Sequence, residues 1–177
     1  TELTLDMKQL SEAPLTDLPK QLHALPQAYA HWIQRERQKI ADDPTLAEFA
    51  PEADSAMNRC ERACARIQEG IALLQHDAQA AEAFRFANAA MWQQRIHTLF
   101  AEQARRGDTP DMERIDLPQH RSWYPFQLAF MLLNLPGITD LSHPDRTDAA
   151  QASADLLWFP TGGGKTEAYL GLAAYTM

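Results

Sequence analysis

Three consecutive glycines near the end of the sequence constrain the backbone more than any other feature. Gly162, Gly163 and Gly164 are followed directly by Lys165 and Thr166. Since glycine has no Cβ, this stretch can curl tightly and point several backbone N–H groups towards one place. The residues that follow have helical character, and the positive end of a helix adds to the attraction for an anion. The pattern therefore predicts a loop that binds phosphate.

The individual side chains have distinct expected roles in such a loop. Lys165 would place its charge between the β- and γ-phosphates of a nucleotide, and Thr166 would give Mg²⁺ a hydroxyl ligand. We therefore predict ATP and Mg²⁺ as cofactors, with Lys165 and Thr166 as the catalytic residues and Thr166 as the metal ligand. The nucleotide would be bound by Thr161, the three glycines, Lys165 and Thr166. A glycine-rich turn followed by a chance Lys-Thr pair is the weaker alternative, because the flanking segments also fit.

The loop departs from the general phosphate-loop pattern at one position. That pattern requires a glycine five residues before the Gly-Lys pair, where this chain has Phe159. The sequence Pro-Thr-Gly-x-Gly-Lys-Thr instead resembles motif I of superfamily 2 helicases. The upstream sequence Tyr-Pro-Phe-Gln, ending at Gln127, resembles the element in which the same superfamily reads adenine, although many relatives have arginine in place of Tyr124.

A glutamine is chemically suited to that role, because its amide can both donate to and accept from the edge of adenine. We therefore include Gln127 among the nucleotide-binding residues, the alternative being a glutamine exposed on a helix. Trp123, Tyr124 or Phe126 could stack on the base, or could belong to the core.

A short apolar segment precedes the loop. Residues 155–159, Asp-Leu-Leu-Trp-Phe, predict a strand buried on both faces of a parallel sheet. Strand, loop and helix in this order resemble the start of a RecA-like α/β ATPase domain. The predicted fold class is thus a mostly α N-terminal domain followed by the first β-strand, phosphate loop and helix of such a domain. Since the acidic motif and second lobe of a motor cannot be placed, we expect the chain to be part of a longer polypeptide and residues 1–177 alone to be inactive.

Further segments carry a closer resemblance. Residues 83–88, 123–130, 133–137 and 156–159, together with the loop and the residues after it, resemble the helicase subunit of the bacterial DISARM antiphage defence system, a DrmA-like protein. The resemblance implies an ATP-dependent DNA helicase or translocase that acts on foreign DNA beside a partner protein subunit and a methyltransferase. The alternative function is a helical partner-docking or regulatory module with a nucleotide-sensing loop and no motor activity.

The rest of the chain predicts helices. Apolar residues recur at helical spacing over residues 22–40, 57–74 and 79–106, with a helix start at Pro51 before the second stretch, which favours an antiparallel helical bundle. A further apolar helix, residues 126–135, is expected to end at Pro136 and Gly137, before a polar loop over residues 138–153. We predict an irregular arm (1–20), a helical bundle domain (21–107), a linker (108–122) and the start of the ATPase lobe (123–177).

Charge and cysteine content limit the possible partners and location. The net charge of −8 provides no general attraction for nucleic acid, so DNA would be bound through motor lobes outside this segment. No apolar run is long enough for a membrane span, and the first residues do not form a secretory signal. Cys60 and Cys64 are expected to be free core thiols, which fits the bacterial cytoplasm.

One basic stripe remains open to two interpretations. Arg59, Arg62 and Arg66 lie three and four residues apart beside the apolar face of the second helix. They could contact phosphate, but pairing with Glu61 and Glu69 on a solvated face is favoured.

Overall fold

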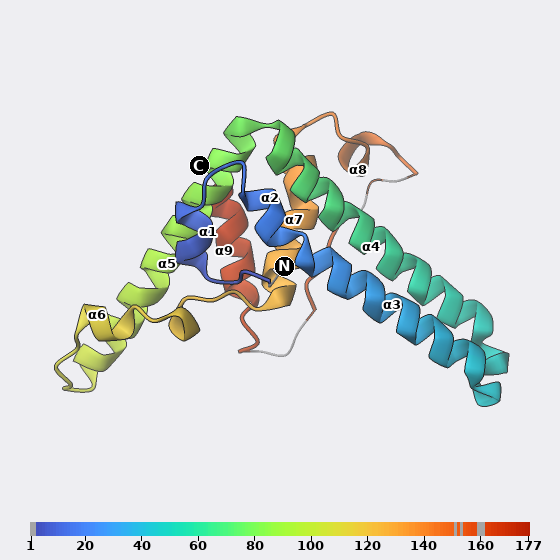
Figure 1. Ribbon diagram of the computed structural model, residues 1–177, viewed down its shortest axis with the longest axis horizontal. Coiled ribbons are helices and arrows are strands. Elements are labelled where there is room, and N and C mark those ends of the chain that lie inside the picture. The colour runs from blue at the N-terminus through green and yellow to red at the C-terminus, as the bar shows by residue number, and fades with distance from the viewer. Residues whose placement is uncertain (1–2, 151, 153, 159–161) are drawn as a thin grey trace.

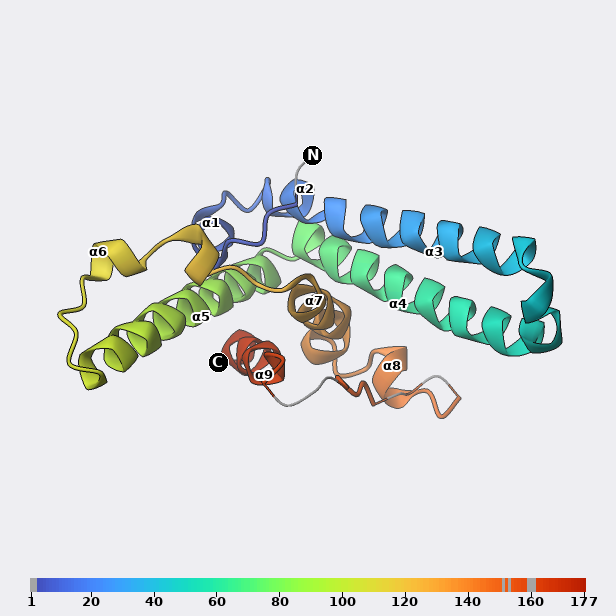
Figure 2. The same cartoon turned by 90° about the horizontal axis from the view of Figure 1, so that it is seen from below.

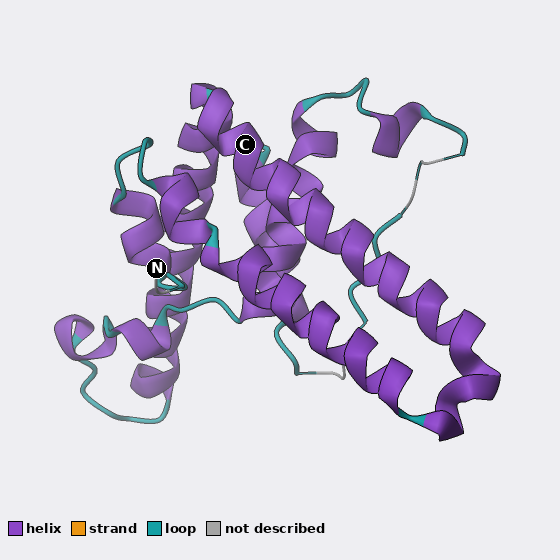
Figure 3. Cartoon of the chain, turned by 45° about the vertical axis from the view of Figure 1, so that its right-hand side comes forward, coloured by secondary structure: helices purple, strands orange, loops and turns teal. Residues whose placement is uncertain are grey.

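Helices account for all the regular secondary structure that the structure describes. The computed structural model describes residues 3–150, 152, 154–158 and 162–177, and none of these residues forms a strand (Figure 3). The elements in chain order are α1 (Met7–Glu12), α2 (Leu18–Leu22), α3 (Ala24–Asp42), η1 (Pro44–Phe49), α4 (Ala50–His76), α5 (Ala78–Arg105), α6 (Met112–Ile115), η2 (Pro118–His120), α7 (Pro125–Thr139), α8 (Pro144–Thr147) and α9 (Lys165–Tyr175). No described helix is both long and apolar enough to cross a membrane.

The three predicted long helices are present as α3, α4 and α5, but their arrangement differs from a closed bundle. Helices α3 and α4 form an antiparallel hairpin, whereas α5 diverges from α4 at their junction, so that the hairpin and α5 are the arms of a V (Figures 1 and 2). Helix α7 packs against α4, and α9 packs against both α5 and α7. The two helices nearest the glycine loop therefore occupy the angle of the V.

Helices α1 and α2 belong to the core. The segment predicted to be an irregular arm contains α1 and α2, and Leu10, Leu18 and Leu22 are fully buried. They share one apolar cluster with residues of α4, α5 and α7 and with Tyr175 of α9. This cluster contains residues from both sides of the predicted linker at residues 108–122. The division of the chain into domains at that linker stays a prediction.

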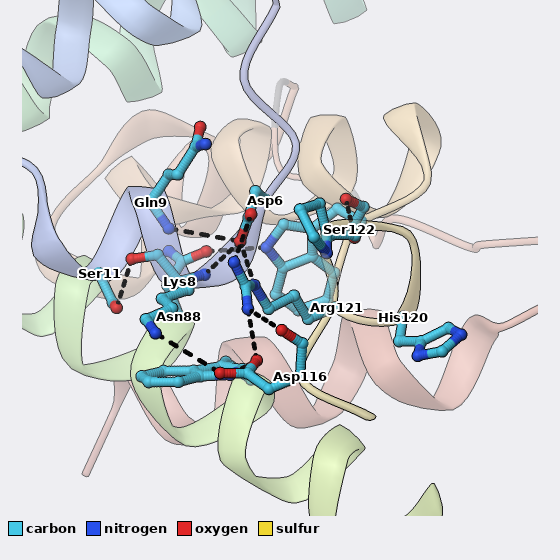
Figure 4. Close-up of polar contacts among 12 residues, drawn as sticks. Asp6, Lys8, Gln9, Ser11, Asn88, Asp116, His120, Arg121 and Ser122 are labelled. Atoms are coloured by element: carbon cyan, nitrogen blue, oxygen red, sulfur yellow. Dashed lines mark hydrogen bonds and ion pairs between the residues drawn. The ribbon is translucent and has the colours of Figure 1, made fainter. Parts of the chain in front are cut away.

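A buried ionic network joins the N-terminus to the residues just before α7 (Figure 4). Arg121 donates to both carboxylate oxygens of Asp6, at 2.9 and 3.1 Å, and also to Asp116, which accepts a further bond from Trp92 Nε1 at 2.7 Å. Burial tends to raise the pKa of Asp116, but the bonds from Arg121 and Trp92, with the charges of Arg121 and Lys8, outweigh it, so the pKa lies below its usual value. The network fixes the backbone that leads into α7.

The predicted RecA-like start of an α/β domain is wrong for the residues that the structure describes. Residues 154–158 have no regular secondary structure, and Phe159, the last residue of the predicted strand, lies outside the described residues. A strand needs a neighbour to pair its backbone N–H and C=O groups, and none of the described segments supplies one. Leu156 and Trp158 are each 81% exposed instead of buried between helices.

Helix α7 also extends beyond its predicted end. It continues through Pro136 and Gly137 to Thr139. Proline lacks the N–H group that would bond to the carbonyl of Leu132, four residues earlier. Packing of the surrounding buried residues, among them Leu135 and Pro136 itself, maintains the helix across that missing bond.

Candidate functional site

The glycine loop leads directly into α9. Gly162 and Gly164 have φ angles of +84° and +83°, in the left-handed region that glycine adopts without strain. Gly164 is the N-cap of α9, and Lys165 and Thr166 are the first two helical residues. The expected loop-to-helix transition is therefore present, with Lys165 half-buried and Thr166 exposed. Thr161, also predicted to bind the nucleotide, lies outside the described residues.

Gln127 lies against the loop. Its side-chain oxygen accepts a bond from the backbone N–H of Tyr124 at 2.7 Å, and its Nε2 donates to the carbonyl of Gly164 at 2.6 Å. The side chain thus caps the start of α7 and joins it to the start of α9, 37 residues later in the chain. Gln127 is only 3% exposed, so it is not the solvent-facing glutamine of the alternative interpretation. Its contact with adenine stays a prediction.

The three aromatic residues beside Gln127 have different environments. Trp123 is 2% exposed and donates to Asn88 Oδ1 at 2.8 Å, which makes it a core residue. Tyr124 is 61% exposed, and its ring is stacked on that of Phe126 with centroids 5.9 Å apart. A methyl group at Gly164 would lie 3.5 Å from the Tyr124 ring. Of the three, Tyr124 has an exposed ring next to the glycine loop.

A cavity of about 300 Å³ lies beside the loop. Its lining includes Gly162 and Gly164 with Tyr124 and Gln127, residues that the sequence had linked to the site. It also includes side chains that the sequence did not link to the site: Gln94 and Arg95 of α5, Gln119 of η2, and Glu167 of α9. Gln94 and Arg95 are exposed positions on a long helix, and no spacing pattern distinguishes them from other solvated residues there.

The segment between α7 and the loop is attached to α4 by Arg66. Both terminal nitrogens of Arg66 donate to the two carboxylate oxygens of Asp155, each at 2.7 Å. Its Nε lies 2.6 Å from Asp145 Oδ2, in an ion pair without hydrogen-bond geometry, and Arg62 is 3.6 Å from the same carboxylate. The hydrogen bond to Asp155 is the largest cause of a raised pKa at Arg66.

We predicted that the arginine stripe pairs with Glu61 and Glu69, and this prediction is wrong: the partners of Arg66 are Asp145 and Asp155. Glu61 binds Arg37 at 2.9 Å, and His143 lies 3.0 Å from Glu69. Partners on the same helix were predicted because only local spacing is visible in a sequence, whereas the structure brings the loop after α7 onto α4.

Cys60 and Cys64 are free thiols, as predicted. Cys64 is buried, with Sγ 3.5 Å from the carbonyl oxygen of Pro26, and Cys60 is half-buried. Neither is part of the candidate site.

These observations define a helical module that leads into a Gly-Gly-Gly-Lys-Thr loop at the start of a helix. No protein-family model matches the chain. The chain is 38% identical over 176 residues to the DISARM protein DrmA of Bacillus paralicheniformis (strain ATCC 9945a / NCIMB 11709 / CD-2), an alignment that covers 97% of this chain. The DrmA-like character inferred from the sequence is confirmed. The alignment covers 14% of the length of that relative.

Proposed function

We propose that this chain is part of an ATP-dependent DNA helicase or translocase of superfamily 2 that acts in bacterial antiphage defence. The similarity to a protein named for DISARM supports the defence role. Residues 162–166 would bind ATP and Mg²⁺, and DNA would be bound outside this segment. A partner protein of the same defence system would act with it in the cytoplasm.

One observation carries the nucleotide part of this proposal. Gly164 adopts a left-handed conformation at the N-cap of α9 and has no side chain that could bond the first N–H groups of the helix. The N–H groups of a first helical turn have no partners within the helix and favour a negative charge. Lys165 and Thr166 follow at the first two helical positions, where the cationic group and the hydroxyl would be next to phosphate oxygens.

Gln127 supports the same site from the side of α7. By accepting from Tyr124 N and donating to Gly164 O, it fixes the backbone of the loop relative to the exposed Tyr124 ring. A preorganised loop binds phosphate without first losing conformational freedom. ATP, when bound there, would supply the β–γ phosphoanhydride bond whose hydrolysis to ADP and phosphate drives movement on DNA.

Substitution of Lys165 tests the proposal. In the full-length protein, Lys165→Ala should lower DNA-stimulated ATP hydrolysis by about 100-fold or more, because the charge that stabilises the transferring phosphate is removed. Lys39→Ala is the matched control, since Lys39 is an exposed lysine on α3, far from the loop in sequence, and its Nζ lies 2.7 Å from Glu36 on the same helix. Circular dichroism should show the same thermal transition for both variants. Unchanged turnover in the Lys165 variant would refute the assigned role.

A further inference from the structure

We infer that the 300 Å³ cavity beside the glycine loop receives the base of the nucleotide, and that Gln94, Arg95 and Gln119 determine its selectivity. The inference rests on the proposed nucleotide function and extends it. It assigns part of the nucleotide site to α5 and η2 of the helical module, outside the loop and outside Gln127.

The cavity lies beside the loop, so the base and the phosphates of a nucleotide would bind at neighbouring places. Gly162 and Gly164 form its edge, so a nucleotide held by the loop at the start of α9 would extend from there into the cavity. Pockets for whole drug-sized ligands range from about 300 to about 1,000 Å³. A cavity at the lower limit has room for a base and part of a sugar, while the triphosphate remains at the loop.

The charges around the cavity favour a neutral ligand. Arg95 supplies one positive charge and Glu167 one negative charge. The remaining polar lining includes three amides, a hydroxyl and an imidazole: Gln94, Gln119, Gln127, Ser122 and His120. A second anion site would need an excess of positive charge, which this lining lacks. Amides provide a donor and an acceptor on one planar group, which matches the edge of a heteroaromatic base.

Existing contacts hold two of these side chains at the cavity. Gln94 Nε2 donates to Thr98 Oγ1 at 3.1 Å. The carboxamide oxygen of Gln94 is an acceptor of the kind that an exocyclic amine requires. Arg95 Nε donates to the carbonyl of His120 at 3.4 Å, which tethers the guanidinium beside η2. A planar guanidinium can stack on an aromatic face, and adenine has both such a face and an exocyclic amine.

The test compares ATP with inorganic tripolyphosphate, which has the phosphates but no base. Binding of each to the full-length protein would be measured by isothermal titration calorimetry. The double variant Gln94→Ala/Gln119→Ala should weaken ATP binding about tenfold, since each change removes a hydrogen-bonding amide. Its affinity for tripolyphosphate should equal that of the wild type. Arg95→Ala should likewise weaken ATP more than tripolyphosphate.

Two controls separate this inference from the proposed function. Gln93→Ala removes an exposed glutamine from the same turn of α5 that does not line the cavity, and should bind ATP normally. Lys165→Ala should lose affinity for both ligands.

The outcomes are distinguishable. Equal loss of both ligands in the double variant, or unchanged ATP affinity, overturns the base-site inference and leaves the loop assignment standing. Failure of the wild-type protein to bind either ligand overturns both.

Discussion

At the scale of single residues, Gly70 decides how closely α4 and α7 approach. A Cβ atom at this position would lie 2.0 Å from the carbonyl oxygen of Leu132 and 2.7 Å from its carbon. That carbonyl is the one that loses its usual helical donor, because the residue four positions later is Pro136. Gly70, which has no side chain, therefore packs directly against the Leu132 carbonyl that Pro136 leaves without its helical donor.

Gly70→Ala should consequently destabilise the protein. Alanine gains about 1 kcal/mol of helix propensity over glycine, but the clash is with backbone, which cannot move without separating the two helices. We expect a net loss of about 1–3 kcal/mol of unfolding free energy, measured by urea denaturation. Gly171→Ala is the matched comparison, since the nearest neighbours of its new methyl would be side chains, Met131 at 2.7 Å and the Trp123 ring at 3.0 Å. Equal losses in the two variants would contradict this explanation.

At the scale of elements, α4 holds the segment that runs from α7 to the glycine loop. The bidentate pair between Arg66 and Asp155, residues 89 positions apart, joins this segment to α4. Asp145 adds a second carboxylate beside the same guanidinium. Arg66 is 14% exposed on its side chain, so the pairs are partly shielded from water and from salt. The positions of Asp145 and Asp155 thus depend on α4.

Removal of Arg66 should release that segment. Arg66→Ala leaves Asp145 and Asp155 close together without their shared cation, so backbone amides of residues 141–158 should exchange with deuterium about tenfold faster or more. Arg66→Lys should restore protection only in part, because an ammonium cannot form the paired bonds of a guanidinium. Arg59→Ala, at an exposed position earlier on α4, should leave exchange unchanged. Unaltered exchange in the Arg66→Ala variant would show that other contacts fix the segment.

At the scale of the whole molecule, a single apolar cluster crosses the predicted domain boundary. Leu10 of α1 and Phe84 of α5 lie in one cluster with Trp123, Leu132 of α7 and Tyr175 of α9. The ionic network around Arg121 adds a second connection, between Asp6 near the start of the chain and Arg121 and Asp116 within the connector. The two parts of the chain therefore stabilise each other.

A nick in the connector should not separate these parts. Arg105 and Arg106 are exposed at the end of α5, just before Gly107, and are accessible to trypsin. After limited cleavage there, the two fragments should elute together in size-exclusion chromatography under native conditions, because separation would expose the shared core to water. They should elute separately in concentrated urea. Separate elution without denaturant would show that the shared core does not hold the two fragments together.

Local sequence patterns by themselves determined where the long helices form and where the backbone makes a left-handed turn. The periodicity of apolar residues placed α3, α4 and α5, and the run of glycines before Lys165 placed a left-handed turn at the start of a helix, because only glycine adopts that conformation freely. The resemblance around Gln127 correctly indicated a residue near the loop. Its bond to Gly164 shows that proximity, and its contact with a base stays a prediction.

Only the tertiary structure decided the features that depend on distant partners. The apolar segment at residues 155–158 predicts a strand on composition, yet a strand requires a paired neighbour, and Arg66 on α4 binds Asp155 instead. Burial of Leu10, the divergence of α5 from α4 and the cavity between Gln94 and Gly164 likewise arise where segments far apart in the sequence meet. Periodicity reports which face of an element is apolar, and it does not report which surface that face will cover.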